Sequence, residues 1–292
     1  IQGFVCREVQ MAVKIVTDST SYIPKHIAER YDIEVLSLSV FMSEEIRREL
    51  DWSNERFYEE MKKTGIFPKS AQPGIDEIRQ SFEKFLKSGD QVLGIFLSSK
   101  MSGTYSTAGT VRNYLLEIYP DARIEILDSR TNSMQLGFAA IEAARAASDG
   151  AGIDEAVSRA EHVIHNSRFL FTPQTLEYLR KGGRIGGAAA LAGQILSIRP
   201  VLTVKDGETK VFSKARTKRK AVDAILKKLY EDAAGLRVKE VAVHHINCEE
   251  EGIRLADEIS RNLGIEVMVE SIGPVIGTHV GPGSVGVAYW WQ

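Results

Sequence analysis

Three polar segments rich in glycine lie far apart in the chain, and their side chains are of the kinds that bind anions. Segments 98–105, 182–187 and 277–283 read SSKMSGTY, GGRIGG and GTHVGPG. Glycine lets backbone approach a ligand closely, while hydroxyl, guanidinium and imidazole groups donate hydrogen bonds to an oxyanion. Each segment alone is also compatible with an ordinary turn. Together they favour one polar site for an anionic ligand.

The first segment places Ser102, Gly103 and Thr104 at the predicted start of a helix. Free backbone N–H groups and the positive end of the helix dipole favour an anion there. Ser102 can donate its hydroxyl proton to a carboxylate or a phosphate. It can equally serve as the N-cap of the helix, and the two roles are compatible.

The other two segments supply a guanidinium and an imidazole. Arg184 lies between two pairs of glycines and suits bidentate binding of a carboxylate or phosphate, although it is also interpretable as a surface arginine. His279 is followed closely by Gly281 and Gly283, and it can donate to an anion or be purely structural. Ser70 is a further hydroxyl that by itself indicates nothing.

Composition sets the broad class of the protein. The chain has 292 residues, of which 43% are hydrophobic and 26% charged, so it is long enough for two domains with sizeable cores. A net charge of −2 gives no general attraction to nucleic acid or to a membrane surface. No run of about 18 apolar residues is present, so an integral membrane protein is not expected. Two cysteines without metal-ligand spacing fit a reducing cytoplasm.

The first part of the chain alternates strands with helices. The hydrophobic pattern predicts strands at 13–17, 35–40, 91–97 and 124–127, and helices at 24–31, 54–64, 75–88, 104–118, 135–148 and 153–166. Residues 69–73 are predicted to be a loop. This order favours a parallel sheet covered on both faces, with polar segments 18–20, 98–104 and 128–130 meeting at the carboxyl edge of its strands. Residues 1–10 do not resemble a signal peptide; we expect Met11 to be the natural start, and 1–10 to be a non-native or disordered extension.

The pattern changes near residue 166. Strands are predicted at 169–171, 199–204, 210–214, 238–245, 266–271 and 285–290, and helices at 173–181, 188–198, 216–235 and 249–263. Asp206-Gly207 predicts a hairpin turn, so 210–214 should return antiparallel. We therefore expect an α/β protein of two domains. Residues 11–166 form an N-terminal α/β domain with a parallel sheet, and 167–292 form a C-terminal α+β domain with a mixed or antiparallel sheet.

Several other groupings could carry chemistry. His162 and His165 are spaced for metal binding but lack a third ligand nearby, and the adjacent His244 and His245 point to opposite faces of a strand. A basic cluster of Arg216, Lys218, Arg219 and Lys220 begins a helix, either as a solvated face or as a docking patch. Helix 188–198 is apolar nearly all round, which suits close packing or the lining of an apolar cavity. No phosphate-binding P-loop, dinucleotide fingerprint or nucleophile elbow is present.

Taken together, the segments resemble the DegV family over nearly the whole chain from Val13 onward. The resemblance rests on seven ordered motifs at 16–20, 70–73, 98–104, 128–130, 176–184, 216–217 and 273–283. The family pattern at the second motif is usually Thr-Ser-Gln-Pro, whereas this chain has Ser70-Ala71-Gln72-Pro73. Ser70 keeps a hydroxyl at this motif, and the alanine departs from the pattern.

The resemblance implies a bacterial two-domain α/β protein that binds one long-chain fatty acid, such as palmitate, and has no catalytic activity or cofactor. The acyl chain would occupy an apolar tunnel. The carboxylate would lie between the domains, held by Ser70, Ser102, Arg184 and His279. Such proteins present the bound acid to a separate fatty-acid kinase subunit, and Arg216 is similar to the position used for that docking.

Elementary energetics agrees with a fatty acid as ligand. Each buried methylene contributes roughly 0.8 kcal/mol, so about fourteen contribute on the order of 11 kcal/mol before the costs of association. Hydrogen bonds to the carboxylate contribute roughly 1.5–3 kcal/mol each. The tunnel should therefore set affinity, and the polar groups should set orientation.

Two enzymatic alternatives stay open at this point. The first is a hydrolase of acyl esters with Ser102 as nucleophile and His279 as base, and with Asp18 or Asp128 as the orienting acid. The second is a phosphotransferase of the dihydroxyacetone-kinase type, which also lacks a P-loop. A shortage of clustered carboxylates for Mg²⁺ argues against the second.

Overall fold

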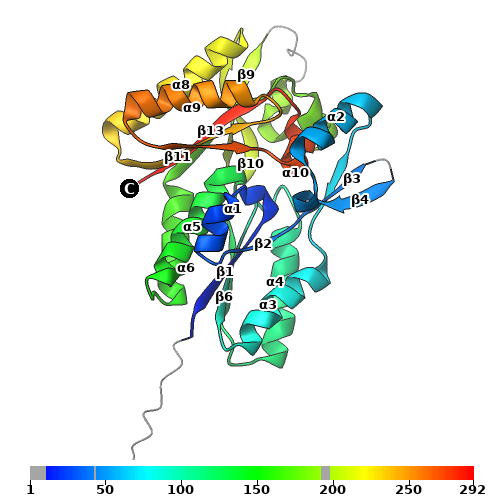
Figure 1. Ribbon diagram of the computed structural model, residues 1–292, viewed down its shortest axis with the longest axis vertical. Coiled ribbons are helices and arrows are strands. Elements are labelled where there is room, and N and C mark those ends of the chain that lie inside the picture. Colours follow the sequence, from blue (N-terminus) through cyan, green and yellow to red (C-terminus); the bar gives the residue numbers. More distant parts are fainter. Residues whose placement is uncertain (1–10, 43, 192–197) are drawn as a thin grey trace, which may run out of the picture.

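The computed structural model describes residues 11–42, 44–191 and 198–292 (Figure 1). Its strands are β1 (Val13–Asp18), β2 (Glu34–Leu36), β3 (Ser39–Met42), β4 (Glu45–Arg48), β5 (Lys69–Ala71), β6 (Gln91–Phe96), β7 (Ile124–Asp128), β8 (Ser167–Thr172), β9 (Arg199–Lys205), β10 (Glu208–Ala215), β11 (Val238–His245), β12 (Val267–Ser271) and β13 (Val285–Trp291). Its α-helices are α1 (Lys25–Arg30), α2 (Asn54–Thr64), α3 (Ile75–Lys87), α4 (Thr104–Ile118), α5 (Ser133–Ser148), α6 (Ile153–His165), α7 (Glu177–Lys181), α8 (Lys218–Gly235), α9 (Glu249–Leu263) and α10 (Pro274–Val280). Short 3₁₀ helices are η1 (Ser19–Ser21), η2 (Glu49–Asp51) and η3 (Gly186–Leu191).

The strands of the first half form a four-stranded parallel sheet in the order β2-β1-β6-β7. Its interior strands are almost continuous apolar runs because helices cover both faces. The predicted meeting of polar segments at the carboxyl edge is confirmed: the Asp18 carboxylate accepts from the Leu97 N–H at 2.8 Å, and the Ser99 hydroxyl donates to Asp128 at 2.5 Å.

A six-stranded mixed sheet is formed by the strands from β8 onward, in the order β10-β9-β8-β13-β11-β12. Only β11 and β12 run parallel, and the other neighbouring pairs are antiparallel. The turn at Asp206-Gly207 has positive φ at both residues, as a two-residue hairpin requires, and it returns β10 against β9 as predicted. The mixed fold class expected from the sequence is therefore confirmed.

The helices and large sheets stack in layers (Figure 1). Helices α3 and α4 cover one face of the four-stranded sheet, and α8 and α9 cover the outer face of the six-stranded sheet. Helix α5 packs against strands of both sheets, and it is buried nearly all round. Its many alanines allow this close approach, so a continuous core joins the two halves.

A third, small sheet corrects two predictions. Segment 35–40 is not one strand: it divides between β2 and β3, which belong to different sheets. The break falls at Ser37-Leu38, where Leu38 N–H donates to the Ser19 hydroxyl and the Ser37 hydroxyl accepts from Leu50 N–H. Residues 69–71, predicted as loop, form β5, which pairs with β3, while β4 completes the sheet.

Two helix predictions and the interpretation of one glycine segment also need correction. Helix α7 begins at Glu177 rather than at Pro173, since the Thr175 hydroxyl accepts from the Glu177 N–H and starts the helix there. In the predicted helix 188–198, the described part belongs to the 3₁₀ helix η3, and 192–197 lie outside the described residues. The third glycine segment, 277–283, is compatible with an ordinary turn by its sequence, but its residues 277–280 belong to α10.

Two further predictions concern the N-terminal extension and the absence of a membrane-spanning segment. The predicted extension 1–10 lies outside the described residues. Among the residues that the structure describes, no helix is both long enough and apolar enough to span a bilayer.

Candidate functional site

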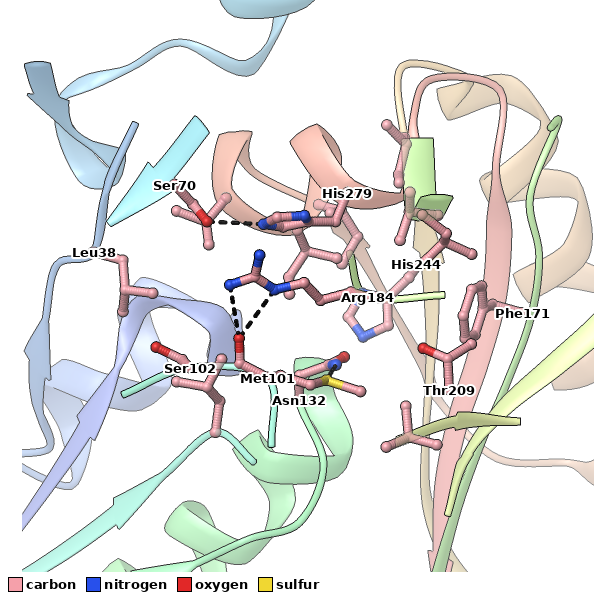
Figure 2. A pocket seen from close by; sticks show the side chains of 18 of the residues that line it. Leu38, Ser70, Met101, Ser102, Asn132, Phe171, Arg184, Thr209, His244 and His279 are labelled. Carbon is pink, nitrogen blue, oxygen red and sulfur yellow. Dashed lines mark hydrogen bonds between the residues drawn. The ribbon is translucent and has the colours of Figure 1, made fainter. Parts of the chain in front are cut away.

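A cavity of about 240 Å³ lies between the two large sheets, and segments from all parts of the chain line it. Its apolar wall includes residues of the first half and of the six-stranded sheet, among them Leu38, Leu97, Phe169, Phe171, Val204 and Ile272. Ser70, Ser102, Arg184 and His279 also line it, and Figure 2 shows their polar groups gathered at one side of the cavity. The structure therefore brings together the four residues expected to bind an anion.

His279 and Ser70 form a hydrogen-bonded pair across 209 positions of sequence, with Nε2 and Oγ separated by 2.8 Å. Ser70 is the middle residue of β5 and is half-buried at the cavity wall, whereas its neighbours Lys69 and Ala71 are exposed. His279 lies in the last turn of α10 and is 9% exposed. The two residues come from opposite halves of the chain and lie together on the cavity wall.

The His279 ring is neutral. Burial, together with the nearby charge of Arg184, lowers the pKa of His279 to about 4. Its Nδ1 is buried without a hydrogen-bond partner among the described residues. A proton on Nδ1 would be a buried donor without an acceptor, so we assign the proton to Nε2, which donates to Ser70 Oγ. The Ser70 hydroxyl proton is then free to point at a ligand in the cavity.

Gly182 packs against the His279 ring on the side of Nδ1. A β-carbon at Gly182 would lie 2.2 Å from His279 Nδ1, so only glycine permits this approach. The carbonyl of Gly182 also accepts from Arg184 Nη1 at 2.6 Å. Glycine at this position thus serves both the imidazole and the guanidinium.

Arg184 is oriented by backbone carbonyl groups. Nε and Nη2 each donate to the carbonyl oxygen of Met101 at 3.1 Å, and in Figure 2 the guanidinium lies between this carbonyl and the His279–Ser70 pair. Within the described part of the chain, these contacts and the one to Gly182 use three of its five N–H groups. The other two N–H groups can donate to an anionic ligand. The positive charge of the guanidinium would then balance the negative charge of that ligand.

Ser102 and Gly103 complete the polar side of the cavity. The Ser102 hydroxyl lies 2.9 Å from the Thr104 hydroxyl and accepts weakly from the Thr104 N–H at 3.3 Å, so Ser102 lies just before α4. The N-cap is Gly103, so the N-cap role considered for Ser102 is wrong. A β-carbon at Gly103 would lie 2.1 Å from Gln72 Oε1. Gln72 lines the cavity and donates to Thr107 on α4 at 2.6 Å. The second and third sequence motifs thus pack directly against one another.

The remaining glycines of the third segment follow α10 and contact Tyr178 and the start of α8. Gly281 has φ of +84°, and a β-carbon there would meet the Tyr178 ring at 2.3 Å. The carbonyl of Gly283 accepts from Lys218 Nζ at 2.8 Å, which fixes the start of α8 to the loop after α10. Arg216 is exposed just before α8 and does not line the cavity.

His244 is a cavity residue that the sequence analysis missed. Its Nε2 accepts from the Met134 N–H at 3.1 Å, and its Nδ1 donates to the Glu270 carbonyl at 3.3 Å. Burial lowers the pKa of His244 to about 4, so this ring is also neutral. With both nitrogens satisfied, the ring behaves as a flat apolar surface within the wall. The only sequence signal was its place in a strand that alternates between two buried faces.

The arrangement suits an amphiphile with an anionic head. One fixed cation and several hydroxyl donors face one side of the cavity, while aliphatic and aromatic side chains line the rest. In the described ranges, no three His, Cys, Asp or Glu side chains come together as metal ligands. A Ser102–His279–Asp relay is not formed by these residues either, because His279 contacts Ser70 and its Nδ1 meets no carboxylate.

Comparison with known proteins agrees with this fold. Residues 12–291 match the family described as "Uncharacterised protein, DegV family". A DegV domain-containing protein of Clostridium acetobutylicum is 52% identical over 282 residues, which are 97% of this chain and 99% of that protein. This chain belongs to the DegV family, and the resemblance expected from the seven motifs is confirmed.

Two solved structures are similar over the same extent. A DegV family protein from Thermus thermophilus, described by its fatty acid binding, has a TM-score of 0.89 at 28% identity and covers 97% of this chain and 100% of its own. DegV of Bacillus subtilis, described as a fatty acid binding protein, has a TM-score of 0.88 at 34% identity with the same coverage.

Proposed function

We propose that this protein binds one long-chain fatty acid. The acyl chain would occupy the apolar part of the cavity, and the carboxylate would lie at its polar side, between units 11–166 and 167–292. The observation that carries the proposal is the convergence of Ser70, Ser102, Arg184 and His279 on a single, otherwise apolar cavity. Fatty acid binding by the two similar DegV structures supports it.

Each polar residue has a separate task in this proposal. Arg184 supplies the charge and two directed N–H groups, and Ser70 supplies a hydroxyl proton oriented by His279. Ser102 would turn its hydroxyl from Thr104 to the second carboxylate oxygen. Several donors are needed because a buried carboxylate without partners is costly.

We propose further that the protein has no chemistry of its own and presents the acid to a partner fatty-acid kinase, which would form the acyl phosphate. The exposed Arg216 lies two residues before Lys218, whose Nζ donates to the carbonyl of Gly283, and it would contribute to docking. The support for a kinase partner is the family resemblance.

The test is identification of the bound molecule. Native mass spectrometry of the protein as purified, followed by denaturation and lipid analysis, should find close to one carboxylic acid of roughly palmitate length per chain. The Arg184→Met variant, purified identically, should retain much less. A protein that is empty as purified and takes up no added palmitate would refute the proposal. Hydrolysis of acyl esters that is lost in Ser102→Ala would instead favour the hydrolase alternative.

A further inference from the structure

Glu49 is a buried carboxylate outside the cavity, and it links the two halves of the chain. It lies in η2 directly after β4 and is 4% exposed. Its Oε1 accepts from the backbone N–H of Val275 and from the hydroxyl of Tyr22, both at 2.9 Å, while its Oε2 accepts from the hydroxyl of Ser19. Burying a carboxylate is costly unless it is hydrogen-bonded, and three donors satisfy the Glu49 carboxylate here.

The direction of these hydrogen bonds follows from the other partners of the two hydroxyls. Ser19 Oγ accepts from the Leu38 N–H at 3.0 Å, and Tyr22 Oη accepts from the Ile276 N–H at 3.3 Å. Both hydroxyl protons are therefore available to Glu49. Only a group that accepts at both of its ends satisfies all three donors, and a carboxylate does this whereas an amide does not.

What Glu49 holds is the beginning of α10. Val275 and Ile276, in the first turn, line the cavity, and His279 lies one turn further along the same helix, against Ser70. The helix has only seven residues, so a shift at its first turn is transmitted to its last. Tyr58 supports the same region by donating to the carbonyl groups of Ile272 and Gly273.

We propose that Glu49 is a positioning residue for the ligand: by fixing the first turn of α10 to the opposite half of the protein, it sets the place of His279 and so the direction of the Ser70 hydroxyl. This inference rests on the proposed binding of a fatty acid at the cavity. It assigns to Glu49 a role in recognising the carboxylate although Glu49 does not line the cavity.

The experiment compares Glu49→Gln with a matched control, Glu240→Gln. Glu240 also links the two halves, through Arg145 on α5, but it does not contact α10. Both variants and the parent are titrated with palmitate and with hexadecanol. Loss of an oriented charge-assisted contact should weaken palmitate binding by about tenfold or more in Glu49→Gln. Hexadecanol binding should be nearly unchanged, and Glu240→Gln should bind palmitate like the parent.

A general loosening of the fold would weaken the acid and the alcohol alike, and this result would overturn the proposal. Unchanged palmitate affinity in Glu49→Gln would overturn it as well. In the His279→Ala background, Glu49→Gln should add little further loss, since the group that it positions is already absent. If Glu49→Gln does not fold, Tyr22→Phe removes one of the three donors and should produce the same selective loss to a smaller extent.

A measurement without ligand separates this inference from the proposed function. Hydrogen exchange of the amides in 275–280, and the ring ¹⁵N signals of His279, are compared between the parent and the two variants. Exchange in this segment should be about tenfold faster in Glu49→Gln, with shifted His279 signals, and unchanged in Glu240→Gln. A parent that binds no palmitate refutes the fatty-acid proposal, whereas unchanged exchange and ring signals refute the role of Glu49.

Discussion

The substitution Gly182→Ala tests the geometry of the polar site with a single methyl group. The backbone at Gly182 has φ of −76°, which alanine adopts without strain. The added carbon would nevertheless lie 2.2 Å from His279 Nδ1 and 3.1 Å from the carbonyl oxygen of Tyr178. Such a distance is far inside van der Waals contact, so the buried imidazole must move.

Movement of the imidazole breaks the 2.8 Å contact between His279 and Ser70, and the Ser70 hydroxyl is then free to rotate. The expected cost is one hydrogen bond to a charged ligand, about 1.5–3 kcal/mol, which corresponds to roughly 10- to 150-fold weaker binding. The apolar part of the cavity stays intact, so affinity for an uncharged chain of equal length should change little.

The assay is calorimetric titration of palmitate and of hexadecanol into the parent, Gly182→Ala and Gly183→Ala. Gly183 is the matched control, because a β-carbon there meets no atom within 4 Å. Its φ of +70° makes alanine strained by about 1 kcal/mol, but this strain does not reach His279. A folded Gly182→Ala protein that binds palmitate as tightly as the parent would refute the assigned roles of His279 and Ser70.

Three other substitutions have defined outcomes. Arg184→Met should weaken palmitate binding by about 10- to 100-fold and hexadecanol binding much less, by the same titration. His244→Leu leaves the Met134 N–H and the Glu270 carbonyl unpaired and should lower the free energy of unfolding in urea by about 2–4 kcal/mol near pH 8. Burial lowers the pKa of His244 from its ordinary value of 6.5, which the unfolded chain retains, to about 4 in the folded protein. The buried neutral imidazole therefore contributes its full stabilisation above pH 6.5 and loses it as pH falls towards 4. The difference in free energy of unfolding between the parent and His244→Leu should shrink over that range. Gly277→Ala places a carbon 1.9 Å from the Tyr58 hydroxyl and should lower stability by about 1–3 kcal/mol in thermal unfolding, whereas Gly152→Ala, where space is open, should not.

The elements predicted best are those whose evidence is local. Helices 54–64, 104–118 and 249–263 and strand 238–245 were predicted with the bounds that the structure shows. They are at least eight residues long, so their apolar periodicity extends over several repeats. The hairpin turn at Asp206-Gly207 was also predicted correctly, since the backbone conformation there depends on the residues themselves.

The elements predicted worst are short and held by distant partners. Strand β5 has three residues and exists through pairing with β3, and α10 has seven residues secured by Glu49 and Tyr58, which lie more than two hundred positions away. Neither is long enough to show a period. The missed His244 belongs to the same class, because only packing of α5 against the six-stranded sheet turns that side of β11 into a cavity wall.

By itself the sequence determined the fold class, the family and the residue types of the site: two hydroxyls, a guanidinium and an imidazole, with the latter two and Ser102 in segments rich in glycine. Their individual roles at a ligand carboxylate stay predictions. Only the tertiary structure decided that these groups share one cavity, that the Met101 and Gly182 carbonyls aim Arg184, and that His279 meets Ser70. The physical reason is the distance along the sequence between the interacting residues. Side-chain type and backbone freedom are properties of a residue and its neighbours, whereas a 2.8 Å contact between residues 209 positions apart exists only once two sheets have packed on the helix between them.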